Sequence, residues 1–498
     1  MSSPSDNAPV ELTTAEDLQQ RSIIDRSTKA PVLFFLTSGT LWLVLSSLMG
    51  FLASIKLVVP HFLDAGCLWW LNWGRLQPAF INALIYGWGV QAALGVGIWI
   101  MARLCRAPLR NPVTLLVAGH LWNFGVVIGV VNIFAGNQAP GELLEFGRSA
   151  WLLLLTAFVI IAIWIVLMYL TRPEGTNYIS QQYIIGALFW FAWLYTTGNL
   201  FSRSGSGLHA AVSASWYANG LLFLFLVPVA VAAAYYLIPK IVGKPIHSYS
   251  LAQAGFWALA IVGGWAGVQR LTGAPLPQWM PSLSAAAQVF LLIPVACVAV
   301  NHFYTVQGSH GLVQVSPTLR FTFFGAVFYV ASHLVAALVA CFPGMLQFTL
   351  AQDGVRMMVV YSYFTMAMFG AISFIVPRLT GCEWLSPKMI RFHFWWSAYG
   401  SIAMALLLVI GGVAQGQSIG SWDKSFIGAV ENSRGYLIGQ IVAWFFIALS
   451  NLMFFLHISL MVLRLGRRSE RATLLPAAHS HDDYDHAEVV ITTEGAEA

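Results

Sequence analysis

Charged residues are what this sequence lacks most. Only 9% of its 498 residues are charged and 58% are hydrophobic, whereas a typical globular protein has roughly 25% charged residues. A chain this poor in charge cannot cover itself with a solvated surface, which excludes an ordinary soluble domain. The formal net charge of +5 comes from bases in the loops between apolar segments. We therefore expect no nucleic-acid partner.

Several other signals are missing. The five cysteines are scattered, with no Cys-x-x-Cys pair, which leaves a disulfide framework, an iron–sulfur site and a c-type haem attachment unsupported. The alternating pattern of a membrane β-barrel is absent. Residues 1–30 mix acids and bases and show no short apolar core before a cleavage site, so we predict no signal peptide.

Long apolar runs fill the rest of the chain. Each is long enough to cross a bilayer core of about 30 Å as a helix. The sequence therefore predicts an all-α integral membrane protein with twelve transmembrane helices. We place the spans at 31–57, 77–102, 111–134, 149–171, 180–201, 210–238, 250–270, 281–304, 318–342, 355–377, 393–415 and 436–463.

Basic residues follow the even-numbered spans, as at Arg103 and Arg106 or at Lys240 and Lys244. By the positive-inside rule, both termini are expected in the cytoplasm. We divide the chain into a polar N-terminus (1–30), a membrane domain (31–465) and a tail (466–498). The tail is predicted to be disordered, although its histidines and carboxylates at 479–486 could also bind Zn²⁺ or Cu²⁺ weakly.

Five groups of short motifs stand in a fixed order along the membrane domain. Through them the chain resembles subunit I of the cbb3-type cytochrome c oxidases, within the haem–copper oxidase superfamily. The motifs include Asn-Trp-Gly-Arg-Leu-Gln-Pro at 72–78, Trp-Tyr-Ala-Asn at 216–219, Tyr-Tyr-Leu-Ile-Pro-Lys at 235–240, Trp-Ala-Gly at 265–267, Phe-Ile-Val-Pro-Arg-Leu at 374–379 and Phe-His-Phe-Trp at 392–395.

The resemblance implies a twelve-helix bundle in a bacterial inner membrane. Such a bundle holds a low-spin haem b, a high-spin haem and a copper ion, and it reduces oxygen in aerobic respiration. The implied partners are membrane lipid and c-type cytochrome or other respiratory-complex subunits. Six histidines bind the metals in the family, because a neutral imidazole nitrogen coordinates both haem iron and copper.

All six ligand positions lack histidine in this chain. No histidine occurs between His61 and His120 or between His333 and His393, so spans two and ten offer no nearby substitute. The tyrosine that the family cross-links to a copper ligand falls on Gly263 or Gly264. The six ligand positions fall on Phe80, Asn219, Gln269, Arg270, Val355 and Met357.

These replacements remove the metal chemistry that the resemblance would imply. Amide side chains are poor ligands for copper or haem, and an arginine stays charged and repels a metal ion. We therefore expect no haem or copper at these positions, no catalytic residue, and a degenerate, non-catalytic or repurposed subunit I homologue. One alternative is an active terminal oxidase or nitric oxide reductase, with haem b and copper on relocated ligands. Another is a transporter or proton channel that uses the emptied core.

Two ionisable residues within spans are candidates for a functional role, Arg270 and His333, because charge is costly inside a bilayer. Arg270, expected at the end of an apolar helix, could reach the interface or pair with Asp353. Bulky rings such as Phe80 and Tyr361 could fill the space of the missing haems, as could lipid or quinone.

Overall fold

A computed structural model of the chain describes residues 15–63, 70–173, 177–204 and 207–465. The proposed tail at 466–498 lies outside these ranges. Within them the chain folds into twelve membrane-spanning helical segments, as the apolar runs predict. Spans one to six are α1 (Ala15–Val58), α2–η2–α3 (Trp73–Asn82, Ala83–Gly89, Val90–Leu104), α4 (Pro112–Ala135), α5 (Arg148–Leu170), α6 (Ile179–Ser204) and α7–η3–α8 (Gly207–Gly220, Leu221–Leu226, Val227–Val242). Spans seven to twelve are α9 (Tyr249–Val262) with the turns η4 (Gly263–Trp265) and η5 (Val268–Leu271), α10–α11 (Trp279–Phe290, Leu292–Val306), α13 (Pro317–Cys341), α15–η6–α16 (Leu350–Met357, Met358–Thr365, Met366–Thr380), α17 (Pro387–Ile419) and α18 (Phe426–Val462).

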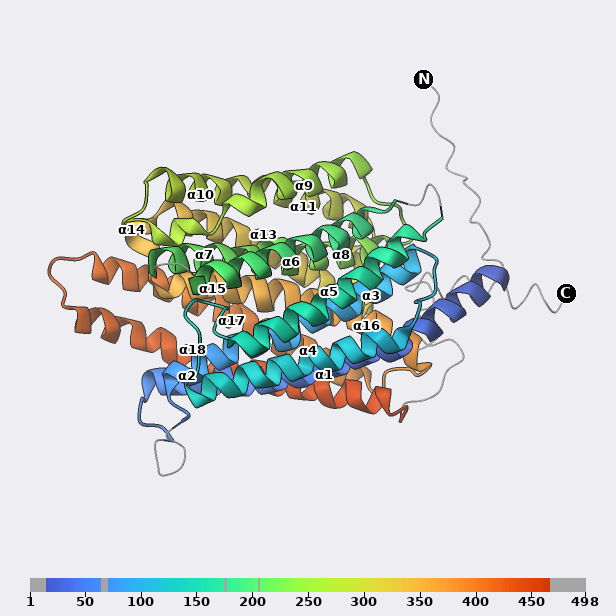
Figure 1. Cartoon of the computed structure of the whole chain (residues 1–498), viewed down its shortest axis with the longest axis horizontal. Coiled ribbons are helices and arrows are strands. Elements are labelled where there is room, and N and C mark those ends of the chain that lie inside the picture. Colours follow the sequence, from blue (N-terminus) through green and yellow to red (C-terminus); the bar gives the residue numbers. More distant parts are fainter. Residues whose placement is uncertain (1–14, 64–69, 174–176, 205–206, 466–498) are drawn as a thin grey trace, which may run out of the picture.

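The spans lie side by side in one bundle (Figure 1). Two short helices, α12 (His310–Val315) and α14 (Pro343–Leu346), lie in the connections on either side of α13. The start of α1 and the end of α18 lie at the same end of the bundle. We call this the terminal end and the other the opposite end.

Spans two, six and ten form the centre of the bundle. Their most apolar windows are 100%, 94% and 100% buried, whereas no other span exceeds 50%. Each of the three contains a π-helical segment, namely η2, η3 and η6. Segments of this kind insert an extra residue into a helix and are frequent at functional sites. The central spans thus recur at every fourth span, a structural repeat that the sequence did not reveal.

Two observed boundaries differ from the sequence predictions. Helix α1 begins at Ala15, so helical structure continues into the polar segment before residue 31. In span seven the α-helix ends at Val262, and Gln269 and Arg270 lie in a separate 3₁₀ turn rather than at the end of the apolar helix. The break follows from Gly267, whose φ of +122° is a conformation that other residues rarely adopt.

Gly267 also lets span seven approach span six closely. A Cβ atom at this position would lie 2.9 Å from the Ser215 carbonyl oxygen and 2.9 Å from the Trp216 Cα atom. An alanine here would be strained by its positive φ and would also clash with the backbone of span six. We therefore expect Gly267→Ala to destabilise the fold by about 1–3 kcal/mol. Gly273→Ala is the matched control, since its φ is +86° but nothing lies within 4 Å. Thermal unfolding of the two purified variants checks this, and equal midpoints would contradict the role of the contact.

Candidate functional site

Four of the six positions that the resemblance assigns to metal ligands surround one small cavity near the opposite end of the bundle, which we call the Gln269 cavity. Asn219, Gln269, Arg270 and Val355 all line it, and its volume is about 40 Å³. A cavity volume of roughly 10–15 Å³ is enough to hold one water molecule, whereas small-molecule pockets have volumes of roughly 300–1,000 Å³. The space therefore suits a few water molecules.

The Gln269 side chain that lines this cavity already forms hydrogen bonds within the protein. The Gln269 Oε1 atom accepts hydrogen bonds from the Gly267 amide (2.6 Å) and the Ser284 hydroxyl (2.7 Å). Its Nε2 group donates to Gln288 Oε1 at 3.3 Å. The buried groups left without a partner are Asn219 Nδ2 and Gln288 Nε2, both N–H donors. Such donors suit water or an anion and offer no lone pair to a metal ion.

Arg270 belongs to a network of charges that joins three parts of the chain. Its Nη1 atom lies 2.9 Å from Glu142 Oε2. Arg356 Nη2 lies 3.1 Å from the other oxygen of Glu142 and 2.7 Å from Asp353 Oδ1. The expected Arg270–Asp353 pair is therefore wrong: Glu142 is the partner of Arg270, and Asp353 joins through Arg356. We call these four residues the Glu142 network.

The electrostatics of the Glu142 network are balanced. Burial by itself raises the pKa of Glu142. The charges of Arg356 and Arg270 and the hydrogen bond from Arg270 outweigh burial, so the pKa falls from 4.5 to about 2. The carboxylate therefore stays ionised at any physiological pH. Two guanidinium groups and two carboxylates then balance in charge, which lowers the cost of burying most of the two arginine side chains.

Glu142 comes from the loop at residues 136–147, which folds inward between α4 and α5. Leu143, Leu144 and Phe146 in this loop are each no more than 2% exposed. The Tyr86 hydroxyl donates to the Leu143 carbonyl at 2.5 Å and lies 2.6 Å from the Tyr217 hydroxyl. Sequence reasoning missed the inward fold of this loop and the pairing of Glu142 with Arg270. A signal of the inward fold was present, however, since Glu142 and Glu145 stand among leucine and phenylalanine residues where a solvated loop would be polar.

Glu145 in the same loop accepts a hydrogen bond from Asn82 Nδ2 at 2.8 Å. Burial raises its pKa to about 7, although the Asn82 bond opposes the shift. A carboxyl whose pKa rises from 4.5 to about 7 on folding binds more protons in the folded state. Its contribution to stability is therefore complete below pH 4.5 and is lost as the pH rises through 7.

We expect the thermal midpoint of the wild type to fall between pH 5 and pH 8 for this reason, as the carboxyl of about pKa 7 ionises. Glu145→Gln carries no titrating carboxyl at this position. Its midpoint should therefore depend less on pH over the same range. Parallel profiles for the wild type and the variant, measured in the same detergent, would show that Glu145 does not titrate there.

The other two ligand positions, Phe80 and Met357, line a second cavity of about 50 Å³, together with Arg356 and Trp444. We call this the Phe80 cavity. Phe80 is 4% exposed and packs edge-on against Trp444, with ring centroids 5.0 Å apart. The predicted filling role thus fits Phe80. Tyr361 is also fully buried, where its hydroxyl donates to Asn451 Oδ1 at 2.7 Å.

His333, the second candidate functional residue, lines neither cavity, although it packs against Phe223 in the wall of the Gln269 cavity. It is 2% exposed, and its Nδ1 atom lies 2.7 Å from the Tyr329 carbonyl oxygen. Its ring packs edge-on against Phe223 and Tyr329. This is the environment of a histidine held within the bundle. Among the described residues, no group of three or more His, Cys, Asp or Glu side chains could hold a metal ion.

The bundle and its central spans define a class of protein, the polytopic helical subunits of the oxidase type. The family model described as "Cytochrome C and Quinol oxidase polypeptide I" matches residues 30–446. The chain belongs to this family.

Individual relatives agree with this assignment. The chain is 25% identical over 436 residues to a cytochrome c oxidase subunit 1 homolog of Agrobacterium tumefaciens, covering 80% of this chain and 74% of that protein. It is 24% identical over 432 residues to the cbb3-type cytochrome c oxidase subunit CcoN1 of Stutzerimonas stutzeri, covering 83% and 91%. A chain of a haem–copper terminal oxidase dimer has the same fold, with a TM-score of 0.74, 13% identity and coverage of 94% and 90%.

Proposed function

We propose that this chain is a non-catalytic or repurposed member of the family that binds neither haem nor copper at the six ligand positions. It would serve as a membrane scaffold or assembly partner in a bacterial respiratory complex, with both termini in the cytoplasm. The observation that carries the proposal is the Glu142 network. In this network Glu142 pairs with Arg270, which the resemblance aligns with a copper ligand of the family.

The donor set of the Gln269 cavity does not fit copper. Arg270 keeps its charge in a protein and has no lone pair to give. The Gln269 oxygen already accepts two hydrogen bonds, and Asn219 turns an N–H donor inward. A divalent ion would have to displace these bonds and sit beside a guanidinium, which is unfavourable in a region of low dielectric.

The Phe80 cavity does not fit a haem. Phe80 has no atom that can ligate iron, and its ring packs edge-on against that of Trp444 on α18. Met357 could in principle bind iron through its sulfur, but a six-coordinate haem needs a second ligand on the facing span. The remaining volume of about 50 Å³ is several-fold below that of a typical cofactor pocket.

Metal and haem content test this proposal directly. The protein would be purified from membranes of cells supplied with haem precursor and copper. Pyridine haemochrome spectra and mass-spectrometric metal analysis would follow. The Stutzerimonas stutzeri relative, expressed in the same way, is the positive control. We expect this chain to retain well under one-tenth of a haem or copper per molecule. Near-stoichiometric haem b with oxygen consumption would overturn the proposal and support relocated ligands.

The scaffold role has a separate test. Affinity purification of the tagged chain from its native membrane is expected to recover c-type cytochrome or other respiratory subunits. A chain that purifies alone, under conditions that keep a known oxidase complex intact, would contradict the role in assembly.

A further inference from the structure

We propose that the cleft at the terminal end of the bundle is a binding site for the phosphate-bearing headgroup of an anionic lipid. The cleft has a volume of about 560 Å³ and is lined by the ends of α1, α3, α6, α8 and α9. We call it the basic cleft. The proposal does not depend on whether the chain binds haem.

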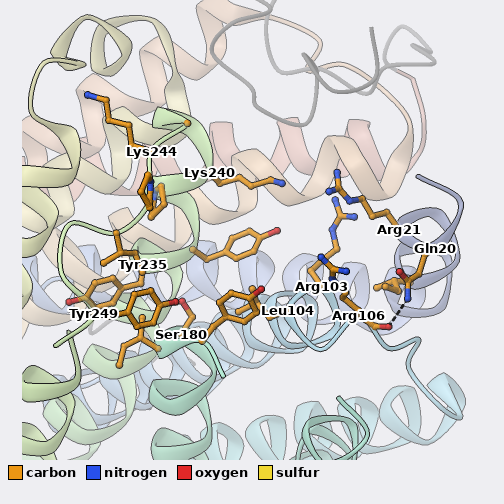
Figure 2. Close-up of a pocket in the computed structure, with 18 residues that line it drawn as sticks. Gln20, Arg21, Arg103, Leu104, Arg106, Ser180, Tyr235, Lys240, Lys244 and Tyr249 are labelled. Atoms are coloured by element: carbon orange, nitrogen blue, oxygen red, sulfur yellow. Dashed lines mark hydrogen bonds between the residues drawn. The ribbon is translucent and has the colours of Figure 1, made fainter. Parts of the chain in front are cut away.

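The charge of the basic cleft has one sign. Its cations come from three helices and from the segments that follow α3 and α8, whereas none of its described lining residues is acidic. In Figure 2, Lys240 extends toward Arg21 and Arg103, while Lys244 points away. The cationic residues of the lining are Arg21, Arg103, Arg106, Lys240 and Lys244.

One carboxylate lies close to this group. Asp25 Oδ1 is 3.6 Å from Arg103 Nε and also accepts a hydrogen bond from Trp99 Nε1 at 3.1 Å. Asp25 therefore offsets part of the charge of Arg103. Lys244 Nζ donates to the Gln307 carbonyl oxygen at 2.9 Å. Because the described residues that line the cleft include five cations and no acid, its composition favours a phosphate group.

The backbone beside Arg106 is held in place. Gln20 Nε2 donates to the Arg106 carbonyl oxygen at 3.1 Å, which ties α1 to the end of α3 (Figure 2). Arg106 itself has a φ of +48°, in the left-handed region that residues other than glycine rarely occupy. Strained residues of this kind cluster at ligand sites, where the surrounding structure over-determines them.

Bases at the ends of spans are common, and the positive-inside rule alone explains their presence. It does not explain their arrangement. Lys388 and Arg391, at the terminal end of span eleven, are both exposed and line no part of the cleft. The cleft residues instead face one concave space that also has aromatic walls, including Tyr235 and Tyr236. A concave site with converging charges is the form that a headgroup pocket takes.

The edge of the cleft indicates a lipid rather than a free phosphate. Tyr249 at this edge is 43% exposed. Farther along α9, the apolar side chains of Trp257 and Ile261 are 59% and 68% exposed. Span seven therefore presents apolar side chains to the membrane on the helix that begins at the cleft. Acyl chains could pack against these side chains while the phosphate occupies the cleft.

Lipid binding by the full chain tests the proposal. The delipidated protein would be titrated in detergent with short-chain phosphatidylglycerol, and with phosphatidylcholine of the same chain length. Native mass spectrometry would count the bound molecules. We expect the wild type to bind the anionic lipid at least tenfold more tightly. The double variant Arg106→Gln/Lys240→Gln should lose most of this preference, and the charge-preserving Arg106→Lys/Lys240→Arg should retain it.

The matched control is Lys388→Gln/Arg391→Gln, which removes two charges from the same end outside the cleft. We expect its preference to stay within twofold of the wild type. Equal affinity for the two lipids, an unchanged Arg106→Gln/Lys240→Gln variant, or an equal loss in the control would overturn the proposal. Tight binding of glycerol 3-phosphate or inorganic phosphate, at the affinity of the lipid, would overturn the lipid assignment. Thermal unfolding of each variant verifies that it is folded.

Discussion

Replacing Glu142 with glutamine is expected to destabilise the protein by about 2–3 kcal/mol, less than the roughly 3–5 kcal/mol for breaking a fully buried ion pair. The substitution leaves Arg270 and Arg356 close together without the carboxylate that joins them. The side chain of Glu142 is 34% exposed, so water reduces the cost. Thermal unfolding in detergent measures the effect. Glu431→Gln, at an exposed site near the start of α18, is the matched control and should change little.

A double-mutant cycle separates the ion pair from general damage. If Glu142 stabilises the fold mainly through Arg270, Glu142→Gln/Arg270→Gln should be less destabilised than the sum of the two single changes. Strict additivity would show that the contact at 2.9 Å contributes nothing to stability. The same network predicts an acid limit. Since folding lowers the pKa of Glu142 from 4.5 to about 2, its contribution is present above pH 4.5 and is lost as the pH falls toward 2.

Phe80→Ala is expected to have a larger effect, a loss of about 3–5 kcal/mol. The change removes a ring that is 4% exposed and packs against Trp444 beside an existing small cavity. The surrounding helices cannot collapse into the space without moving a central span. Phe445→Ala, the same substitution at a position that is 50% exposed, is the matched control.

The outcome at Phe80 also bears on the proposed function. A Phe80→Ala protein as stable as the wild type would mean that this position is not packed as a core residue. Haem binding that appears in the variant but not in the wild type would show that the phenylalanine ring excludes the cofactor. Either result would be seen in the unfolding midpoint and the haemochrome spectrum of the same sample.

In the three central spans, a position predicted from the resemblance to hold a metal ligand adjoins a π-helical segment. Phe80, Asn219 and Met357 all lie within three residues of the start of such a segment, at η2, η3 and η6. Phe80 fills its position by packing against Trp444, whereas Asn219 Nδ2 is a buried donor without a hydrogen-bond partner.

Much of the architecture followed from local composition. The number of spans and the all-α class depend on apolar length alone, since a bilayer leaves a helix few alternatives. The candidate positions came from motifs at fixed spacing, and the structure places Asn219, Gln269, Arg270 and Val355 around one cavity. The break in span seven was not predicted. It depends on the contact between Gly267 and span six, which periodicity does not report.

Sequence by itself determined that this protein is a helical membrane bundle, and the resemblance led to the prediction that histidine is missing at the six ligand positions. Only the tertiary structure decided which acid pairs with Arg270, because Glu142 reaches it from 128 residues away through a loop that folds inward. Long-range charge pairing is set by where the chain turns back on itself. The same holds for the basic cleft, whose cations are scattered along the sequence and meet only when the spans assemble.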